Sequence, residues 1–204
     1  MIINCSSCGI YIDTNVSSYL CTCGVLNAID YSNTNYFEYL GFKPSIHLDN
    51  KRLDESYEKT IQLYHPDIFI NDTVDNQKEA ANHSIYTNDA YKTLSNQLSR
   101  LSYYFYYVTG LEVIHKKQIH DNYLMNNLFF ILYERLHNVN SKREIEELIN
   151  DINNEWDKAL NDFDNALKNK YYQDIKDNIY VRLSYLDKLK RRIVEKFHVS
   201  NRVG

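Results

Sequence analysis

The four cysteines of this 204-residue chain all lie within its first 23 residues, in two close pairs. Cys5 and Cys8 form one pair, Cys21 and Cys23 form the other, and a glycine follows each pair. Four thiolates suit tetrahedral Zn(II), and the glycines allow backbone amides to turn toward sulfur. Four protein ligands leave no position for substrate or water, so zinc is expected to be structural. Iron in a rubredoxin-like centre, or two disulfides in an oxidising compartment, are the alternatives.

A second group of residues with chemical potential is the tripeptide His65-Pro66-Asp67. Pro66 lacks an amide hydrogen and biases His65 away from the helical region, so the tripeptide should lie in a loop with its side chains free to meet a partner. The alternative is an ordinary polar loop in which Pro66 only ends a helix. No nucleophile, base and anion-binding loop come together in the sequence, so no intrinsic catalysis is expected.

Helices should position this tripeptide, because 5 Gly and 2 Pro supply little turn material for a many-stranded β fold. A short helix is predicted over 36–40, and a second begins after Asp49 or Asn50 and ends near Tyr64. Its apolar stripe is Leu53, Tyr57, Ile61 and Tyr64.

Further helices are predicted over 77–94 and 98–108. The helix over 77–94 is expected to carry Ala81, Ile85, Asn88, Tyr91 and Leu94 on one face. From about Gln118 the apolar spacing predicts three helices, with breaks near 138–141 and 169–172. Such short breaks favour antiparallel packing in a three-helix bundle. The expected domains are 1–30, 31–110 and 111–204.

Composition excludes two classes of partner. The formal net charge is -4, and residues 1–30 contain no Lys or Arg, so no nucleic-acid partner is expected. The most apolar stretch, residues 103–108, is far too short to span a bilayer, so no membrane partner is expected. Six histidines lack ligand spacing and are expected at the surface or at helix ends: His47, His83, His115, His120, His137 and His198.

The surroundings of the tripeptide resemble a J-domain. Asn35-Tyr36-Phe37-Glu38-Tyr39-Leu40-Gly41 precedes it, and Asn88-Asp89-Ala90-Tyr91-Lys92-Thr93-Leu94 follows it. The resemblance implies that His65, Pro66 and Asp67 dock on a DnaK-type heat-shock ATPase and trigger ATP hydrolysis, with the Asp67 carboxylate pairing with a partner arginine. Lys51, Arg52 and Lys59 are diluted by Asp54, Glu55 and Glu58, so docking is expected to be less salt-sensitive than that of a strongly basic J-domain.

Nearly the whole chain is similar to the HscB-type co-chaperones of iron–sulfur cluster assembly. The matching segments are Leu98-Ser99-Arg100, Tyr123-Leu124-Met125 and Arg182-Leu183-Ser184-Tyr185-Leu186-Asp187-Lys188-Leu189. In that family the bundle presents an apolar patch to the cluster scaffold protein. The matching residues here are Leu124, Met125, Leu128 and Tyr185, with Leu132 one turn further along. The alternative for each is core packing, which is equally expected for Leu128 and Leu132.

Together these observations predict one fold and one function. The expected fold is all-α, with a J-domain, a C-terminal three-helix bundle and a small N-terminal zinc knuckle, a feature that some eukaryotic HscB-type proteins share. The resemblance implies a non-enzymatic co-chaperone that delivers an iron–sulfur scaffold protein to a DnaK-type ATPase. It also implies a mitochondrion or related organelle, although no presequence is visible and the cytoplasm is the alternative. The rival functions are a general J-protein with another client and a zinc-knuckle adaptor.

Overall fold

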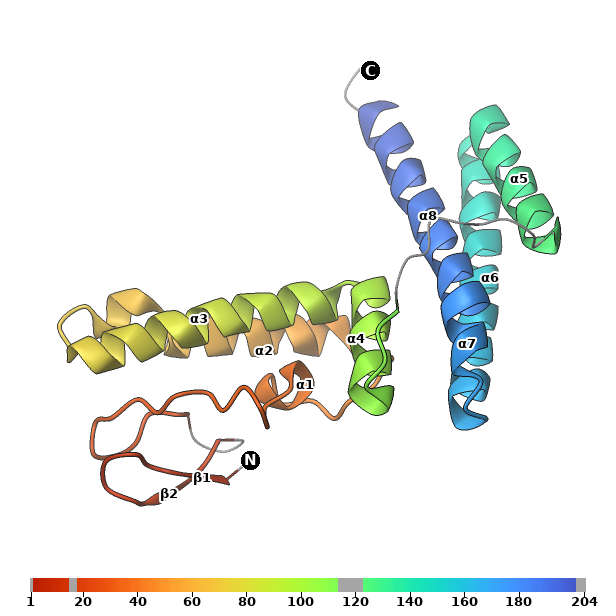
Figure 1. Cartoon of the computed structure of the whole chain (residues 1–204). Coiled ribbons are helices and arrows are strands. Elements are labelled where there is room, and N and C mark those ends of the chain that lie inside the picture. Colours follow the sequence, from red (N-terminus) through yellow and green to blue (C-terminus); the bar gives the residue numbers. More distant parts are fainter. Residues whose placement is uncertain (1, 15–17, 114–122, 201–204) are drawn as a thin grey trace. The chain divides into compact units, whose positions relative to one another are not determined.

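The computed structural model describes residues 2–14, 18–113 and 123–200, and their side chains except those of 123–126 and 197–200. The chain forms two compact units, Met1–Gly110 and Leu111–Gly204 (Figure 1). The all-α fold predicted from the sequence is confirmed, and in the described ranges one small hairpin is the only sheet.

The hairpin opens the first unit. Strand β1 (Ile2–Asn4) pairs antiparallel with β2 (Tyr11–Asp13), and Ile3 lies opposite Ile12. An isolated bridge then joins Leu20 to Leu26. Between them these two ladders hold the segments that carry the cysteine pairs, and Cys5, Ile12 and Cys21 are buried together.

The helices of the first unit each begin at a residue whose side chain accepts a hydrogen bond from the first turn. Such caps satisfy amides that have no partner within the helix. The four helices and their caps are α1 (Tyr36–Tyr39, Asn35), α2 (Asn50–Leu63, Asp49), α3 (Val74–Ser95, Thr73) and α4 (Gln97–Thr109, Asn96). Helices α2 and α3 lie side by side, and α1 and α4 pack on α3 (Figure 1).

The buried face of α3 differs from the predicted one. Of the five residues predicted to share one face, only Leu94 is fully buried, whereas Ile85 is 62% exposed. The residues that α3 buries are Asn76, Ala80, His83, Thr87, Ala90 and Leu94. Most of these are small or polar, and they permit close approach of neighbouring segments while hydrogen bonds satisfy the polar groups.

The second unit is a bundle in which α5 (Tyr123–Asn138), α6 (Lys142–Lys168) and α8 (Tyr180–Ser200) each contact the other two. Ser141 and Glu144 form a capping box at the start of α6. After α6, Lys170 adopts a left-handed conformation (φ 60°), and the short helix α7 (Tyr172–Asp174) and the π-helical turn η2 (Ile175–Ile179) lead into α8. The buried core includes Leu148, Ile152, Phe163, Leu183 and Leu186.

None of the helices in the described ranges is both long and apolar enough to cross a membrane.

Candidate functional site

The four cysteine thiols converge. Their sulfur atoms all lie within 4.8 Å of one another, and the pairs Cys5–Cys23 and Cys8–Cys21 are each separated by 3.6 Å. A disulfide would require about 2.05 Å, and the cysteines are free thiols. A tetrahedron with metal–sulfur bonds of about 2.3 Å has sulfur–sulfur edges of about 3.8 Å. The four sulfurs therefore fit a tetrahedral metal ion with only small adjustments.

Tight turns bring the thiols of each pair together. The Gly9 amide donates to the Cys5 carbonyl (3.0 Å), and the Gly24 amide donates to the Cys21 carbonyl (2.9 Å). Both glycines have positive φ, 73° and 90°, a conformation that a side chain would strain. The sequence predicted that these glycines turn backbone amides toward sulfur, and the amides that follow them, of Ile10 and Val25, point at the Cys8 and Cys23 sulfurs.

Hydrogen bonds already favour one thiolate. The Cys8 and Ser7 amides point at the Cys5 sulfur and lower the pKa of the Cys5 thiol to about 6. The Ile10 amide acts in the same direction on Cys8, but desolvation and the neighbouring thiols prevail and raise the pKa of Cys8 to about 12. The pKa of Cys23 is also raised. Four thiols this close cannot all ionise without a cation between them.

The tripeptide follows α2, which ends at Leu63 as the sequence predicted, but only His65 lies in extended chain, because Pro66 and Asp67 belong to a helical turn. His65 has extended φ and ψ (−61°, 129°), and Pro66 begins a short 3-10 helix, η1 (Pro66–Phe69). The Asp67 amide donates to His65 Nδ1 (3.3 Å). The side chains of His65 and Asp67 are 53% and 85% exposed, so both can reach a partner.

Buried rings hold both ends of the tripeptide. Tyr64 precedes it and Phe69 follows it, and each is only 4% exposed. They share a core cluster with Tyr19, Leu26 and Ala80, so residues from the cysteine segment cover the base of the loop.

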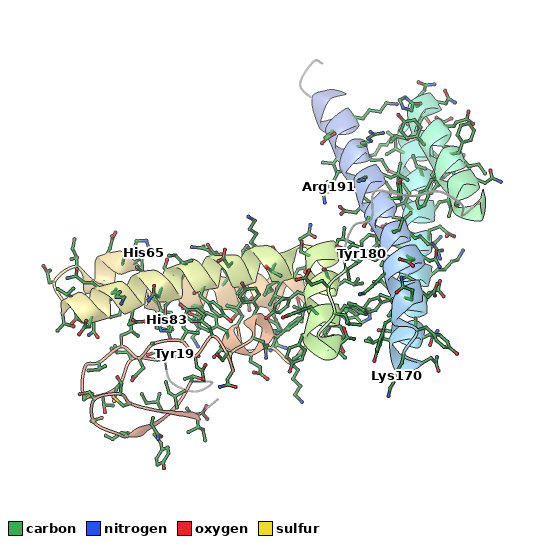
Figure 2. All side chains as sticks on the ribbon, in the orientation of Figure 1. Tyr19, His65, His83, Lys170, Tyr180 and Arg191 are labelled. Atoms are coloured by element: carbon green, nitrogen blue, oxygen red, sulfur yellow. The ribbon has the colours of Figure 1, made fainter. Side chains whose placement is uncertain are left out.

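The histidine prediction is wrong for His83, which is fully buried in this unit beside Tyr19 (Figure 2). His83 Nε2 lies 2.9 Å from the Asn27 carbonyl, which can only accept, so Nε2 carries the proton. Nδ1 then accepts from the Tyr39 hydroxyl (3.0 Å). Burial lowers the pKa of His83, which keeps the ring neutral.

The predicted patch on the second unit is only partly within the described side chains. Leu124 and Met125 lie outside them. Leu128 and Tyr185 are half-buried, and the Tyr185 ring packs 4.7 Å from that of Phe129. Leu132 is 2% exposed, so its side chain packs in the core rather than on the surface.

A groove of about 440 Å³ opens beside Tyr185, between α5 and α8. Its lining combines aromatic, cationic and aliphatic side chains: Phe129, Phe130, Tyr133, Tyr185, Lys188, Leu189 and Arg192. Phe130 is 59% exposed. Lys188 and Arg192 lie over the Tyr185 and Tyr133 rings, with 5.2 Å between each cationic centre and the ring centroid.

Sequence reasoning missed most residues of this groove. The available signal was the pair Phe129-Phe130, because two adjacent large rings cannot both face the core of one helix. A surface ring beside an expected interface residue marks a candidate contact.

No family model matches the chain. The co-chaperone protein HscB of Buchnera aphidicola is 34% identical over 118 residues, which cover 56% of this chain and 67% of that protein. The chain belongs to the HscB co-chaperone family. Another HscB protein, the human iron-sulfur cluster co-chaperone, is 25% identical over 175 residues, 84% of this chain and 72% of its own length.

The fold of the HscB family is also seen in the solved structures. The crystal structure of human HscB aligns with a TM-score of 0.75 at 22% identity, covering 95% of this chain and 98% of that one. The chaperone HscB from Vibrio cholerae aligns with a TM-score of 0.65 at 19% identity, covering 84% of this chain and all of that one. The similarity in sequence to the Buchnera protein confirms the predicted family, and these two structures share its fold.

Proposed function

We propose that this HscB-family chain is an iron–sulfur co-chaperone that stimulates a DnaK-type ATPase through His65-Pro66-Asp67 and delivers a cluster scaffold protein to it. The observation that carries the proposal is the exposed tripeptide held between the buried rings of Tyr64 and Phe69. An exposed imidazole and carboxylate on a rigid base can dock on a partner without a large ordering cost. The ATPase chemistry belongs to the partner.

The scaffold-binding role is assigned to the groove on the second unit together with Leu128 and Tyr185. Exposed aromatic rings on rigid helices provide contact area with little loss of side-chain entropy, which suits a transient interface. Phe130 and Tyr133 extend the patch expected from the sequence, and the buried Leu132 is not part of it. When the groove holds the scaffold protein while the tripeptide docks on the chaperone, the effective concentration of the scaffold at the chaperone rises.

The metal proposed for Cys5, Cys8, Cys21 and Cys23 is zinc, in a structural role. Zinc bound there would cross-link two turns of a segment that has little core of its own. What the protein contributes is a preset thiolate at Cys5, two glycine turns and amides aimed at sulfur.

Steady-state ATP hydrolysis by a DnaK-type chaperone, with and without the scaffold protein, tests the proposal. We expect His65→Gln to abolish stimulation in both conditions. Phe130→Ser should lose only the scaffold-dependent part. The matched control is Val194→Ser, which alters a 54% exposed side chain of α8 that does not line the groove.

Three outcomes would count against the proposal. Stimulation that survives His65→Gln removes the J-domain role. No effect of scaffold on the wild-type protein indicates a J-protein with another client. Equal losses in Phe130→Ser and Val194→Ser indicate that the groove is not the scaffold site.

A further inference from the structure

The cysteine knuckle, residues 2–14 and 18–27, packs on the helices that flank the tripeptide. The contact joins backbone groups of the knuckle to the side chain of Tyr64, which follows α2, and to those of Asn76 and His83 in α3. These partners are far apart in sequence. Each side-chain hydrogen bond that joins the knuckle to these helices is at least partly buried, so its loss would leave a polar group without water.

Asn76 makes the first link. This residue lies in the first turn of α3 and is 4% exposed. Its side-chain Nδ2 donates to the Gly24 carbonyl (2.7 Å), and its Oδ1 accepts from the Leu26 amide (2.9 Å). Gly24 directly follows Cys23. The Asn76 side chain therefore hydrogen-bonds to both a backbone donor and a backbone acceptor of the segment that holds the second cysteine pair.

The same Asn76 side chain also donates to the Asp72 carboxylate (3.0 Å). Asp72 lies in the connection from the tripeptide to α3, and its amide donates to the Phe69 carbonyl (3.0 Å). Asn76 is therefore bonded on one side to the cysteine segment and on the other to the chain that leaves η1.

Tyr64 makes the second link, on the opposite end of the tripeptide. Its hydroxyl accepts a hydrogen bond from the Tyr19 amide (2.9 Å), and both residues are buried. Tyr19 lies two residues before Cys21, and Tyr64 is the residue before His65. The two ends of the tripeptide thus contact the two ends of one short segment, residues 19–26, which contains Cys21 and Cys23.

Asn27 extends the connection to the first cysteine pair. Its Oδ1 accepts from the amide and hydroxyl of Ser6, at 2.8 and 3.1 Å, and its carbonyl accepts from His83 Nε2. Ser6 lies between Cys5 and Cys8. Both halves of the thiol site are therefore bonded to the surface that packs on α3.

We infer that the knuckle is a brace for the His65-Pro66-Asp67 loop, with Tyr64 and Asn76 as positioning residues that make loop order depend on metal occupancy of the four cysteines. Without a cation, no metal–sulfur bonds join the turn that carries Cys5 and Cys8 to the turn that carries Cys21 and Cys23, and the weak core of the segment leaves residues 19–26 poorly fixed. The contacts of residues 19–26 with Tyr64, Phe69 and Asn76 then weaken. The effect on chaperone stimulation rests on the proposed function, whereas loop order does not.

Backbone amide hydrogen exchange in the full chain tests the brace directly. The reporters are the amides of Ile68 and Asp72, which donate to His65 and Phe69 carbonyls at 3.0 Å. The protein is compared in reduced, metal-free form and after addition of zinc(II). We expect zinc to slow exchange at both amides by about fivefold or more, the factor for one net hydrogen bond. Amides of α6 and those near Leu94, in α3, serve as references and should change little.

A pair of single-hydroxyl deletions gives a matched comparison. Tyr64→Phe removes the acceptor for the Tyr19 amide and keeps the buried ring. Tyr91→Phe removes a hydroxyl that donates to Asp54 (2.9 Å), between the same two helices but outside the knuckle contact. We expect zinc-loaded Tyr64→Phe to exchange faster at Ile68 by about fivefold, and Tyr91→Phe to match the wild type there.

Coupling between two sites is reciprocal, so the loop contact must also support the metal. Competition with a chromophoric chelator should show weaker zinc binding by a similar factor in Tyr64→Phe and in Asn76→Ala, with one zinc per chain at saturation. Should Asn76→Ala fail to fold, Tyr64→Phe carries both measurements.

The inference is overturned if the Ile68 and Asp72 amides exchange equally with and without zinc. It is also overturned if zinc slows exchange uniformly over residues 2–110, which would indicate general stabilisation, or if Tyr64→Phe behaves as Tyr91→Phe. These readouts need no chaperone. A chain that passes them while His65→Gln keeps full ATPase stimulation would retain the brace and lose the proposed function.

Discussion

Tyr64 and His83 stack almost face to face, with ring centroids 4.3 Å apart and planes inclined by 23°. The pair joins the residue before the tripeptide to the middle of α3. Because His83 is also bonded through both ring nitrogens, its ring is fixed in one tautomer inside the first unit. A protonated His83 would present a second N–H to the Tyr39 hydroxyl, bury a charge and disturb the stack.

The first prediction is a loss of stability at mildly acidic pH. Burial lowers the pKa of His83 in the folded protein, so as pH falls below the unfolded value of about 6.5 the unfolded chain takes up a proton first. The free energy of unfolding of the first unit should then decrease, by at most about 1.4 kcal/mol per pH unit from this group. Denaturant titrations between pH 7.5 and 5.5 measure this decrease in the free energy of unfolding.

Acid also displaces metal from thiolates, so the pH experiment needs an internal comparison. His83→Gln, measured beside the wild type in metal-free form, should show the smaller loss over the same range. Equal slopes for the two proteins would mean that His83 takes up its proton equally in the folded and unfolded states.

A second prediction concerns Arg182 in the bundle. Arg182 bonds Glu155 (2.6 Å) and Asp162 (3.1 Å), and the Arg182 and Glu155 side chains are only 21% and 17% exposed. Arg182→Met should lower the free energy of unfolding of the second unit by about 1–3 kcal/mol, since it leaves carboxylates with reduced solvation. Arg143→Met breaks an exposed pair with Glu147 on the same helix as Glu155 and should cost less than about 0.5 kcal/mol. Thermal or urea unfolding of both variants measures the two losses of unfolding free energy.

Glu155 gives that ion-pair cluster a pH dependence. Its pKa is lowered by hydrogen bonding to Lys158 and then to Arg182, so its stabilisation is present above the unfolded pKa and is lost as pH falls through the folded one. The difference in unfolding free energy between wild type and Arg182→Met should therefore shrink at acidic pH. A difference that stays constant to pH 3 would contradict the assignment.

A third prediction is that core damage stays within one unit. Phe163 is fully buried in α6, and Phe163→Ala should destabilise the bundle by about 3–5 kcal/mol through lost contacts and a cavity. Ile149→Ala, at a 37% exposed position of the same helix, should cost far less. Hydrogen exchange should show faster opening in α6 and α8 and unchanged protection in α3. Equal loss of protection in α3 would show that the units unfold together.

The fourth prediction concerns salt. Lys51 pairs with Glu55 at 4.0 Å on the exposed face of α2, and Glu58 adds a further negative charge beside Lys59. Chaperone affinity should therefore change by less than about threefold between 50 and 200 mM salt. Glu55→Gln/Glu58→Gln makes the face basic and should increase both low-salt affinity and salt dependence. Strong salt dependence in the wild type would show that another cationic surface dominates docking.

Local rules predicted the features that depend on neighbours in sequence. Pro66 acts on His65 directly, so the end of α2 and the exposed tripeptide follow from the sequence. The glycine turns after each cysteine pair are also local. The buried face of α3 could not be predicted in this way, because Ala80 and Thr87 are buried by segments that approach from elsewhere in the chain. The contacts of His83 have the same origin, since Asn27 lies 56 residues earlier.

Cys5 and Cys23 are separated by 18 residues, whereas the bonds from Leu26 to Asn76 and from Asn27 to His83 span 50 and 56 residues. Short loops close at a lower entropic cost and form faster than long ones. The thiol site can therefore assemble on a growing chain before α3 has been synthesised. The packing of the knuckle on α3 must wait until Asn76 and His83 have been synthesised. Synthesis order alone would thus separate any metal binding at these thiols from the ordering of the tripeptide loop.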